Sequence, residues 1–237
     1  MTLRVAAIGD LHVGEGHRHP YRELFAEISH AADVLALCGD LTNLGTLREA
    51  EILAEDLRSC SIPVLGVLGN HDHESGRGGE VMEMLEQGGM LPLEARTQVI
   101  DGVGFAGVKG FGGGFEGRML GAFGEPAIKS FVGEAIGEAM RLENALRALA
   151  EEAERLVVVL HYAPIPATVE GEAREIYPFL GSSRLAETID RFPVAAVFHG
   201  HAHHGVHRGQ TPRGVPVYNC AQTVIKDDDR RWALVEV

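Results

Sequence analysis

The chain has 237 residues, of which 45% are hydrophobic and 6% aromatic, a composition that predicts a globular protein with a sizeable core. Its 34 acidic and 21 basic residues give a formal net charge of −13, which argues against binding duplex nucleic acid or an anionic membrane through a broad basic surface. The three cysteines are widely separated without a Cys-x-x-Cys motif, and neither a leader-like N-terminus nor a run of about 18 apolar residues is present, so we expect one cytoplasmic domain spanning residues 1–237, with no membrane partner.

Three short apolar runs in the N-terminal part each lead to a glycine followed by a polar residue. Residues 3–8, 34–38 and 62–68 are predicted to be buried strands, and they lead to Asp10, Asp40 and Asn70. The spacing is 30 residues in both intervals, about the length of one βαβ unit. Two right-handed crossovers would place the three residues at one edge of a parallel sheet, where α/β proteins bind their ligands.

Helical and strand patterns alternate along the rest of the chain. Apolar periodicity predicts helices near 21–28, 47–57, 81–85 and 183–190, and Thr46 with Glu49 forms a plausible capping box for the second. A longer helix is expected over 130–156, whose alanine-rich stripe favours packing on the domain's own sheet, with a coiled-coil face as the alternative. Further strands are expected over 98–107 (a pair), 156–160, 194–198, 215–218 and 232–237, with the charged run 226–231 as a solvated turn.

Residues 103–124 form a glycine-rich segment. It contains nine glycines together with Phe105, Phe111, Phe115 and Phe123. This composition predicts a loop insertion, either mobile at the mouth of a pocket or a surface insertion whose phenylalanines pack beneath it.

The sequence His71-Asp72-His73 follows the third predicted strand. Considered alone, it suggests a local metal site in which all three side chains are ligands, because imidazole and carboxylate groups suit first-row divalent metals. Two later predicted strands also end in histidine, at His161 and in the segment 199–204. The site therefore has to be assessed over the whole chain.

Five motifs occur in order, each at the end of a predicted strand. They are Asp-x-His at 10–12, Gly-Asp at 39–40, Gly-Asn-His-Asp at 69–72, a histidine at 161 and Gly-His-x-His at 200–203. In this the chain resembles the calcineurin-like metallophosphoesterases, over most of its length. The resemblance implies an α/β fold, a four-layer α/β/β/α sandwich of two mixed β-sheets flanked by helices, known as the metallo-dependent phosphatase fold.

The resemblance also implies a dinuclear metal centre bridged by Asp40. The cofactors would be two divalent or mixed-valence transition-metal ions, and manganese, iron, zinc, cobalt and nickel all suit nitrogen and oxygen ligands. His201 and His203 are two residues apart, so in an extended strand both would face the same side. The implied ligand sets are Asp10, His12 and His203 for one ion, and Asn70, His161 and His201 for the other.

Residues beside the implied ligands are candidates for further roles. His71 is expected to protonate the leaving oxygen or to hydrogen-bond the transition state, and Asp72 to orient His71 or a ligand. In this interpretation His73 is no longer a ligand. Candidate substrate-binding residues are Asn43, Tyr162 and His199, the last because strand alternation would place it on the ligand face.

The implied function is hydrolysis of a small phosphate ester by in-line attack of a metal-bridging hydroxide. Analogy with compact relatives favours phosphodiesters, including nucleotide-type ones. The alternatives are a phosphomonoesterase or protein phosphatase of the same fold and, from another class, a metal-bound interaction scaffold without catalysis. A metallo-β-lactamase-type site would need a His-x-His-x-Asp-His block, which the chain lacks. The sequence does not indicate the oligomeric state.

Overall fold

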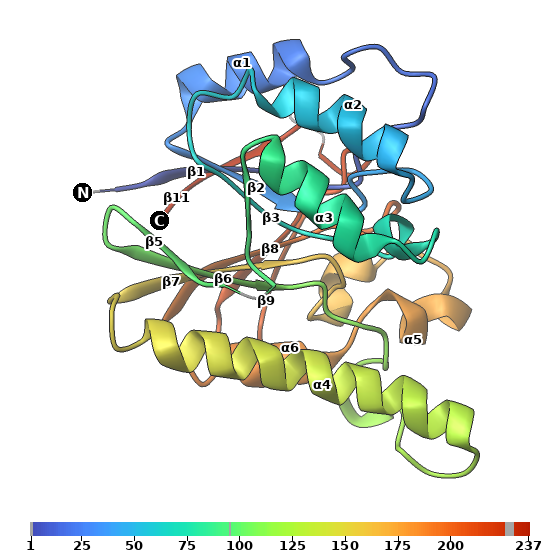
Figure 1. Cartoon of the computed structure of the whole chain (residues 1–237). Helices are drawn as coiled ribbons and strands as arrows, with labels where there is room; N and C mark the ends of the chain where they lie inside the picture. The colour runs from blue at the N-terminus through green and yellow to red at the C-terminus, as the bar shows by residue number, and fades with distance from the viewer. Residues whose placement is uncertain (1, 95, 226–229) are drawn as a thin grey trace.

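The computed structural model describes residues 2–94, 96–225 and 230–237, and it has two β-sheets packed between two layers of helices (Figure 1). The first sheet has the strand order β11-β1-β2-β3-β4, in which β11 is antiparallel to β1 and the other neighbours are parallel. Its strands are β1 (Arg4–Ile8), β2 (Val34–Cys38), β3 (Val64–Val67), β4 (Met90–Pro92) and β11 (Ala233–Glu236).

The second sheet has the order β5-β6-β7-β8-β10-β9. The four central strands are parallel to one another. The edge strand β5 is antiparallel to β6, and the edge strand β9 is antiparallel to β10. Both sheets are therefore mixed, and the predicted four-layer α/β/β/α sandwich is confirmed. The strands are β5 (Gln98–Ile100), β6 (Val103–Val108), β7 (Arg155–Leu160), β8 (Val194–His199), β9 (Arg208–Gln210) and β10 (Pro216–Asn219).

Helices cover the outer face of each sheet (Figure 1). On the first sheet lie α1 (Arg22–Ala31), α2 (Leu47–Leu57) and α3 (Gly78–Gln87), and on the second lie α4 (Pro126–Leu149) and α6 (Ser183–Ile189). In the described ranges, no helix combines the length and the apolarity that crossing a membrane requires. Short helical turns complete the list: η1 (His71–His73), η2 (Glu116–Arg118), η3 (Pro166–Val169), η4 (Arg174–Ile176) and α5 (Tyr177–Leu180).

Alternation along the central strands divides the core between the layers. On β2, Leu35 and Leu37 pack toward α1 and α2, whereas Ala36 and Cys38 pack toward the second sheet. All five residues of this strand are buried, as expected for a parallel sheet covered on both faces. This double burial explains why the strand is a continuous apolar run in the sequence rather than an alternating one.

Several local predictions are confirmed, and others need correction. Both hydrogen bonds of the Thr46–Glu49 capping box form at the start of α2. The stripe on α4 packs in one apolar cluster with β6, β7 and α6, which confirms the own-sheet alternative over the coiled coil. The helix itself begins at Pro126 and ends at Leu149, earlier than predicted at both ends. Strands β4 and β9 were not predicted, and residues 226–229 of the charged run lie outside the described residues.

The glycine-rich segment begins later than predicted. Residues 103–108 are not part of a loop but form β6, which lies beside β7 inside the second sheet. Phe105 is buried in the core between the sheets, and Phe115 is buried as well, whereas Phe123 is exposed. The insertion is thus confined to the residues between β6 and α4, and its first part is fixed by backbone hydrogen bonds to Pro178, Gly181 and Ser183.

Candidate metal centre

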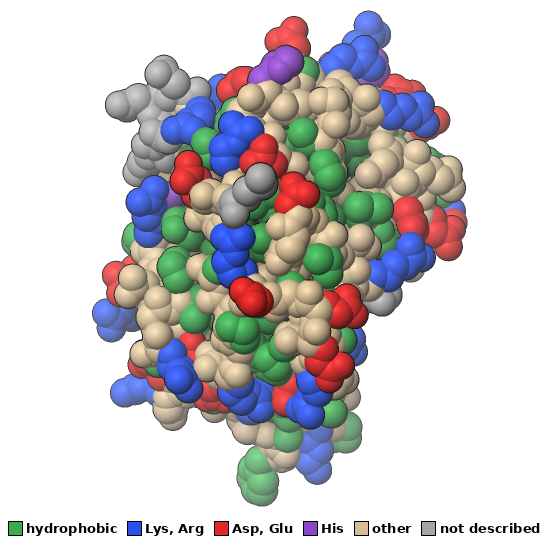
Figure 2. All heavy atoms as spheres, turned by 90° about the vertical axis from the view of Figure 1, so that its left-hand side faces the viewer, with side chains coloured by type: hydrophobic (Ala, Val, Ile, Leu, Met, Phe, Trp, Pro, Cys, Tyr) green, Lys and Arg blue, Asp and Glu red, His purple; other side chains and the backbone are tan. Residues whose placement is uncertain are grey.

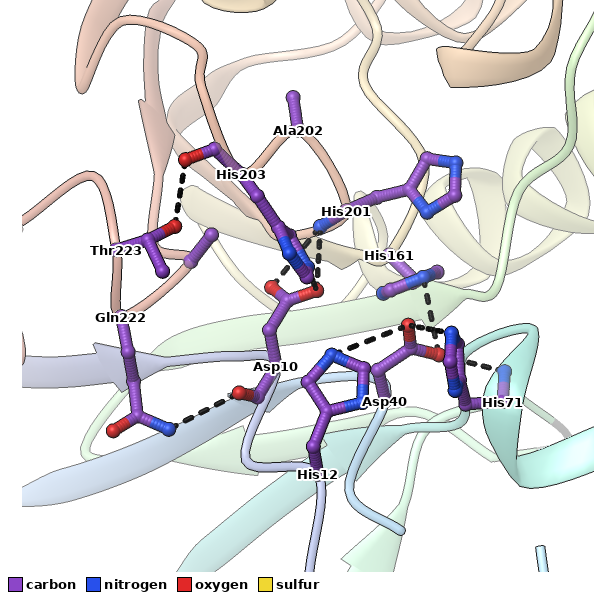
Figure 3. A network of polar contacts seen from close by, with 12 residues as sticks. Asp10, His12, Asp40, His71, His161, His201, Ala202, His203, Gln222 and Thr223 are labelled. Atoms are coloured by element: carbon purple, nitrogen blue, oxygen red, sulfur yellow. Dashed lines mark hydrogen bonds and ion pairs between the residues drawn. The ribbon is translucent and has the colours of Figure 1, made fainter. Parts of the chain in front are cut away.

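The carboxyl ends of parallel strands from both sheets meet at one end of the sandwich. From the first sheet, the segments after β1, β2 and β3 carry Asp10 with His12, Asp40, and Asn70 with His71. From the second sheet, the segments after β7 and β8 carry His161, and His201 with His203. Figure 3 shows the aspartate and histidine side chains converging on a common space. The equal spacing of Asp10, Asp40 and Asn70 predicts this convergence for the first sheet.

Asp40 lies in the middle of this group. Its Oδ1 is 3.3 Å from His161 Nε2 and accepts the backbone N–H of His71 at 2.8 Å. Its Oδ2 is 4.0 Å from His12 Nε2 and 3.9 Å from His71 Nε2. Its Oδ1 therefore faces a histidine ring from the second sheet, and its Oδ2 faces two histidine rings from the first sheet.

Asp10 forms the second acidic position. Its Oδ1 is 2.8 Å from His203 Nε2, and the backbone N–H of His201 lies 3.1 and 3.0 Å from its two oxygens. The ring of His12 lies between the two halves of the group, with its centroid 5.3 Å from that of His203 and 4.6 Å from that of His71. Both carboxylates thus contact histidines contributed by distant parts of the chain.

Three combinations of these side chains have potential ligand atoms within 4.8 Å of one another. They are Asp10, His12 and His203; His12, Asp40 and His71; and Asp40, His161 and His201. The second combination includes His71, which the sequence interpretation placed beside the ligands rather than among them.

The hydrogen bonds of the group fit a bound cation. Both ring nitrogens of His12 are buried without a hydrogen-bond partner in the described part of the chain. His161 donates from Nδ1 to the Cys38 carbonyl oxygen at 2.9 Å, so its Nε2 carries the lone pair. That lone pair faces Asn70 Oδ1 at 2.9 Å and Asp40 Oδ1 at 3.3 Å. Three acceptors facing one another are unfavourable alone and are stabilised by a cation among them.

Backbone carbonyls orient two further rings. His201 donates from Nε2 to the Phe179 carbonyl oxygen at 3.1 Å, which leaves Nδ1 available as a ligand atom. His71 donates from Nδ1 to the Asn43 carbonyl oxygen at 2.7 Å, which turns its Nε2 toward Asp40. Asn43 was predicted as a candidate substrate-binding residue, and the contact that the structure shows is this backbone support of His71.

Burial sets the protonation of most of the group. It lowers the pKa of His201 to about 3, lowers the pKa of His161 well below its usual value and lowers the pKa of His12. These rings are therefore neutral, which is the form that binds metal. Burial also raises the pKa of Asp10, an effect opposed by its hydrogen bond to His203, and that same bond raises the pKa of His203.

Left-handed backbone conformations concentrate in the group. Asp10, His12, Asp40 and His201 have φ values of 59°, 45°, 50° and 71°. This conformation is unfavourable for residues other than glycine, so the surrounding contacts must impose it, as they often do at functional sites. The turn at His201 also corrects one prediction: residues 201–203 are not an extended strand, because β8 ends at His199, and the rings of His201 and His203 converge through a turn instead.

Asp72 was predicted to orient either His71 or a ligand, and its contacts fit the second role. Its buried carboxylate accepts the backbone N–H groups of Leu41, Thr42 and Gly69 at 3.1, 2.7 and 2.8 Å, and the Thr42 hydroxyl at 2.6 Å. Burial raises the pKa of this carboxyl to about 6. Asp72 thus fixes the segments that carry Asp40 and Asn70, and it is the Asn43 carbonyl that orients His71.

Gly69 allows these two segments to approach closely. A β-carbon at position 69 would collide with the side chain and backbone nitrogen of Asp40. The glycine in the Gly-Asn-His-Asp motif is therefore required by the packing of the centre.

Two remaining substrate candidates have different outcomes. The ring of Tyr162 packs against His201 and His161, with centroids 4.4 and 5.4 Å apart, and lines a cavity beside them. His199 is 0% exposed and shares hydrogen bonds of 2.8 Å with Thr168 Oγ1 and the Gly200 carbonyl oxygen. It therefore does not reach a substrate, because its ring points into the interior before the chain turns at residue 200. Burial lowers the pKa of His199 to about 4.

Two supporting residues from the C-terminal part, Gln222 and Thr223, were not predicted. Gln222 donates to the Asp10 carbonyl oxygen at 3.1 Å, and Thr223 donates to the His203 carbonyl oxygen at 2.7 Å (Figure 3). The buried Asn219 donates to the Ala202 carbonyl oxygen at 2.8 Å. Gln222 and Thr223 lie outside the five motifs, so no local sequence signal indicates them.

Two mixed sheets with aspartate and histidine side chains gathered at their carboxyl ends define a metal-dependent phosphoesterase. Residues 3–205 match the family model described as calcineurin-like phosphoesterase, and the chain belongs to that family. It is a metal-dependent enzyme that hydrolyses phosphate esters, and the Asp and His cluster is its divalent metal centre.

Several solved structures have a similar fold. Phosphopantetheinyl hydrolase (PptH) from Mycobacterium tuberculosis is 15% identical with a TM-score of 0.66, and the match covers 92% of this chain and 88% of that one. GAP50, described as the anchor in the inner membrane complex of Plasmodium, is 12% identical with a TM-score of 0.58 over 95% and 73% of the chains. Purple acid phosphatase PPD1 from yellow lupin is 14% identical with a TM-score of 0.53, over 100% of this chain and 48% of the lupin chain. A comparison with curated proteins found no match.

Proposed function

We propose that the centre holds two metal ions bridged by Asp40 and that it hydrolyses phosphate esters of small molecules. One ion would be held by Asp10, His12 and His203, and the other by Asn70, His161 and His201. The observation that carries this proposal is the arrangement of the potential ligand atoms. Both ring nitrogens of His12 are without a hydrogen-bond partner among the described residues, and the lone pairs of His161, Asn70 and Asp40 face one another. Two bound divalent ions would supply a nucleophile near neutral pH and offset charge on the transferring phosphoryl group.

The side chains of the centre limit the negative charge around the phosphate. Among the proposed ligands, only Asp10 and Asp40 are carboxylates, and the others are imidazoles and one amide. Neutral ligands bind a cation without adding charge that would repel the substrate. This balance supports a phosphate ester as the substrate of an otherwise acidic protein.

His71 is proposed to act on the leaving group. Its Nδ1 donates to Asn43, so Nε2 carries a proton only in the imidazolium form, which is the form able to protonate a leaving oxygen. His71 Nε2 lies 3.9 Å from Asp40 Oδ2, within the candidate metal centre. Among the described residues, it has no hydrogen bond to a protein group. A ligand role for His71, in the combination with His12 and Asp40, is the alternative that the geometry offers.

The preference between diesters and monoesters stays a prediction. We propose that phosphodiesters are accepted, by analogy with compact members of the family. The neighbour named phosphopantetheinyl hydrolase shares the fold and supports hydrolysis in general, without indicating which ester this chain takes. A single domain over residues 1–237 and two transition-metal ions are part of the same proposal.

A non-catalytic scaffold is the second candidate, because the neighbour GAP50 is described as an anchor on the same fold. The complete set of ligand-type side chains argues against it here, since a scaffold does not require neutral imidazoles around two carboxylates.

The test uses protein stripped with a chelator and reloaded separately with manganese, iron, zinc, cobalt or nickel. Turnover of 4-nitrophenyl phosphate and of bis(4-nitrophenyl) phosphate compares a monoester with a diester that releases the same leaving group. We expect turnover with at least one metal, abolished by Asp40→Asn. Asp33→Asn is the matched control, because Asp33 pairs with Arg4 on the surface, at the start of β2 rather than its carboxyl end. Inactivity with all five metals and both substrates would favour the scaffold.

A further inference from the structure

A cavity of about 470 Å³ adjoins the metal centre. Asn70 and His201 form one side of it, and the remaining lining residues are Phe111, Gly112, Phe131, Tyr162, Ile176, Phe179 and Leu180. We propose that this cavity binds a hydrocarbon group of the substrate, so that the enzyme selects phosphate esters of alkyl or aryl alcohols. This inference rests on the proposed function and specifies its substrate class.

The cavity is placed to receive a group attached to phosphorus. Two of its lining residues, Asn70 and His201, belong to the proposed ligand set, and Tyr162 packs on His201 with ring centroids 4.4 Å apart. A phosphate held at the centre therefore has one of its ester groups next to this space. A larger cavity of about 880 Å³ has two α5 residues, Tyr177 and Pro178, in its lining but none of the clustered residues.

Aromatic and aliphatic side chains make up most of the lining. Phe111 lies against Phe131 with centroids 4.9 Å apart, Phe131 against Phe179 at 5.8 Å, and Phe111 against Tyr162 at 5.7 Å. Burying hydrocarbon against such rings is favourable and needs no hydrogen-bond partner.

The polar side chains of this lining are Asn70, Tyr162 and His201. His201 Nε2 donates to the Phe179 carbonyl oxygen, and Asn70 Oδ1 is one of the proposed metal ligands. The Tyr162 hydroxyl is therefore the one side-chain group of the lining left to pair with a nucleobase, whose amide-like edge would lose most of its water without replacement, which is costly. The lining thus favours a hydrocarbon group over a nucleotide.

The walls of the cavity are fixed by hydrogen bonds. Residues 110–114 lie against residues 178–181. Gly113 donates to the Pro178 carbonyl oxygen at 2.6 Å, and Gly114 donates to the Gly181 carbonyl oxygen at 2.9 Å. Gly110 donates at 2.7 Å to Glu138, a buried carboxylate of α4. These bonds hold the backbone on two sides of the cavity, on either side of Phe111 and next to Phe179.

One cation and an apolar rim lie next to the lining of the cavity. Lys109 lies over the rings of Phe111 and Tyr162, with Nζ 4.9 and 5.3 Å from their centroids, and it is not among the lining residues. At the mouth, Phe179 is 58% exposed and Ile176 is 40% exposed. An apolar rim that continues into an apolar pocket provides further contact for a longer hydrocarbon group.

The binding test measures affinity rather than turnover. n-Alkylphosphonates from methyl to hexyl keep the phosphonate head constant and cannot be hydrolysed, and calorimetry on the metal-loaded protein gives the Kd of each. We expect Kd to fall about threefold to fourfold per methylene, as burial of one CH₂ group predicts. Hexylphosphonate should also bind more tightly than adenosine 5′-monophosphate.

Two aromatic variants test the location. Phe179→Ala, at an exposed position where folding is not at risk, and Phe131→Ala should each lower the ratio of hexyl to methyl affinity about fivefold. Phe123→Ala is the matched control, because Phe123 is 90% exposed and does not line the cavity, and it should leave the ratio unchanged. An affinity independent of chain length, or a control variant as impaired as the pocket variants, would overturn the inference. If the protein hydrolyses 4-nitrophenyl phosphate and yet shows no chain-length effect, only this inference fails. Absence of all turnover would instead refute the proposed function.

Discussion

Replacing Asp72 by alanine should both destabilise the fold and weaken the metal centre. The carboxylate is fully buried and accepts four hydrogen bonds, from the backbone N–H groups of Leu41, Thr42 and Gly69 and from the Thr42 hydroxyl. At about 1 kcal/mol for each bond, the expected loss is roughly 4 kcal/mol, a large part of the ~5–15 kcal/mol of a typical domain. Because these bonds fix the segments that carry Asp40 and Asn70, metal affinity should also fall about 10- to 100-fold.

The free energy of unfolding is measured by urea titration followed by circular dichroism, on metal-free protein so that metal binding does not contribute. Glu51→Ala serves as the control, since Glu51 forms an exposed ion pair with Arg48 within one helix and its loss should change stability by less than about 1 kcal/mol. A loss below about 1 kcal/mol for Asp72→Ala, or unchanged metal affinity at the lower stability, would refute the structural role assigned to this carboxylate.

The other predictions concern single positions. His71→Ala should keep its full metal content by elemental analysis and lose about 10²- to 10⁴-fold in turnover of an alkyl ester, and undiminished turnover would contradict the leaving-group role. Gly112→Ala should lower the free energy of unfolding by about 1–3 kcal/mol, because its β-carbon would lie 2.5 Å from the Pro178 carbonyl oxygen, whereas Gly117→Ala meets nothing within 4 Å and should be neutral. Thr46→Ala should cost about 1 kcal/mol in the same titration through loss of the capping box, and an unshifted midpoint would count against that bond.

The parts of the fold that were predicted correctly have local causes. Val34–Cys38 is a short apolar run that is followed by a glycine, and it forms β2 with the same bounds. The equal spacing of Asp10, Asp40 and Asn70 follows from two βαβ units, and these residues do lie at one edge of adjacent parallel strands. The rules involved concern period, chain direction and connection length, which the sequence carries directly.

The parts that were missed depend on contacts between distant segments. The alternation rule placed His199 on the ligand face, and it failed because the chain leaves the strand after that residue and turns at His201 with φ 71°. The sequence left open whether Asp72 orients its neighbour His71 or a ligand, because its partners are groups of Leu41 and Thr42 about 30 positions earlier and the backbone N–H of Gly69. The support that Gln222 gives to Asp10 spans almost the whole chain, and no sequence pattern indicates it.

Anomalous diffraction from crystals of the manganese-loaded protein tests the central claim most directly. The proposal predicts two metal peaks about 3.5–4 Å apart. Asp40 should lie between them, with Asp10, His12 and His203 around one ion and Asn70, His161 and His201 around the other. A single peak, or a second ion bound through His71 or His73 without Asn70 and His201, would contradict the dinuclear centre proposed for this phosphoesterase.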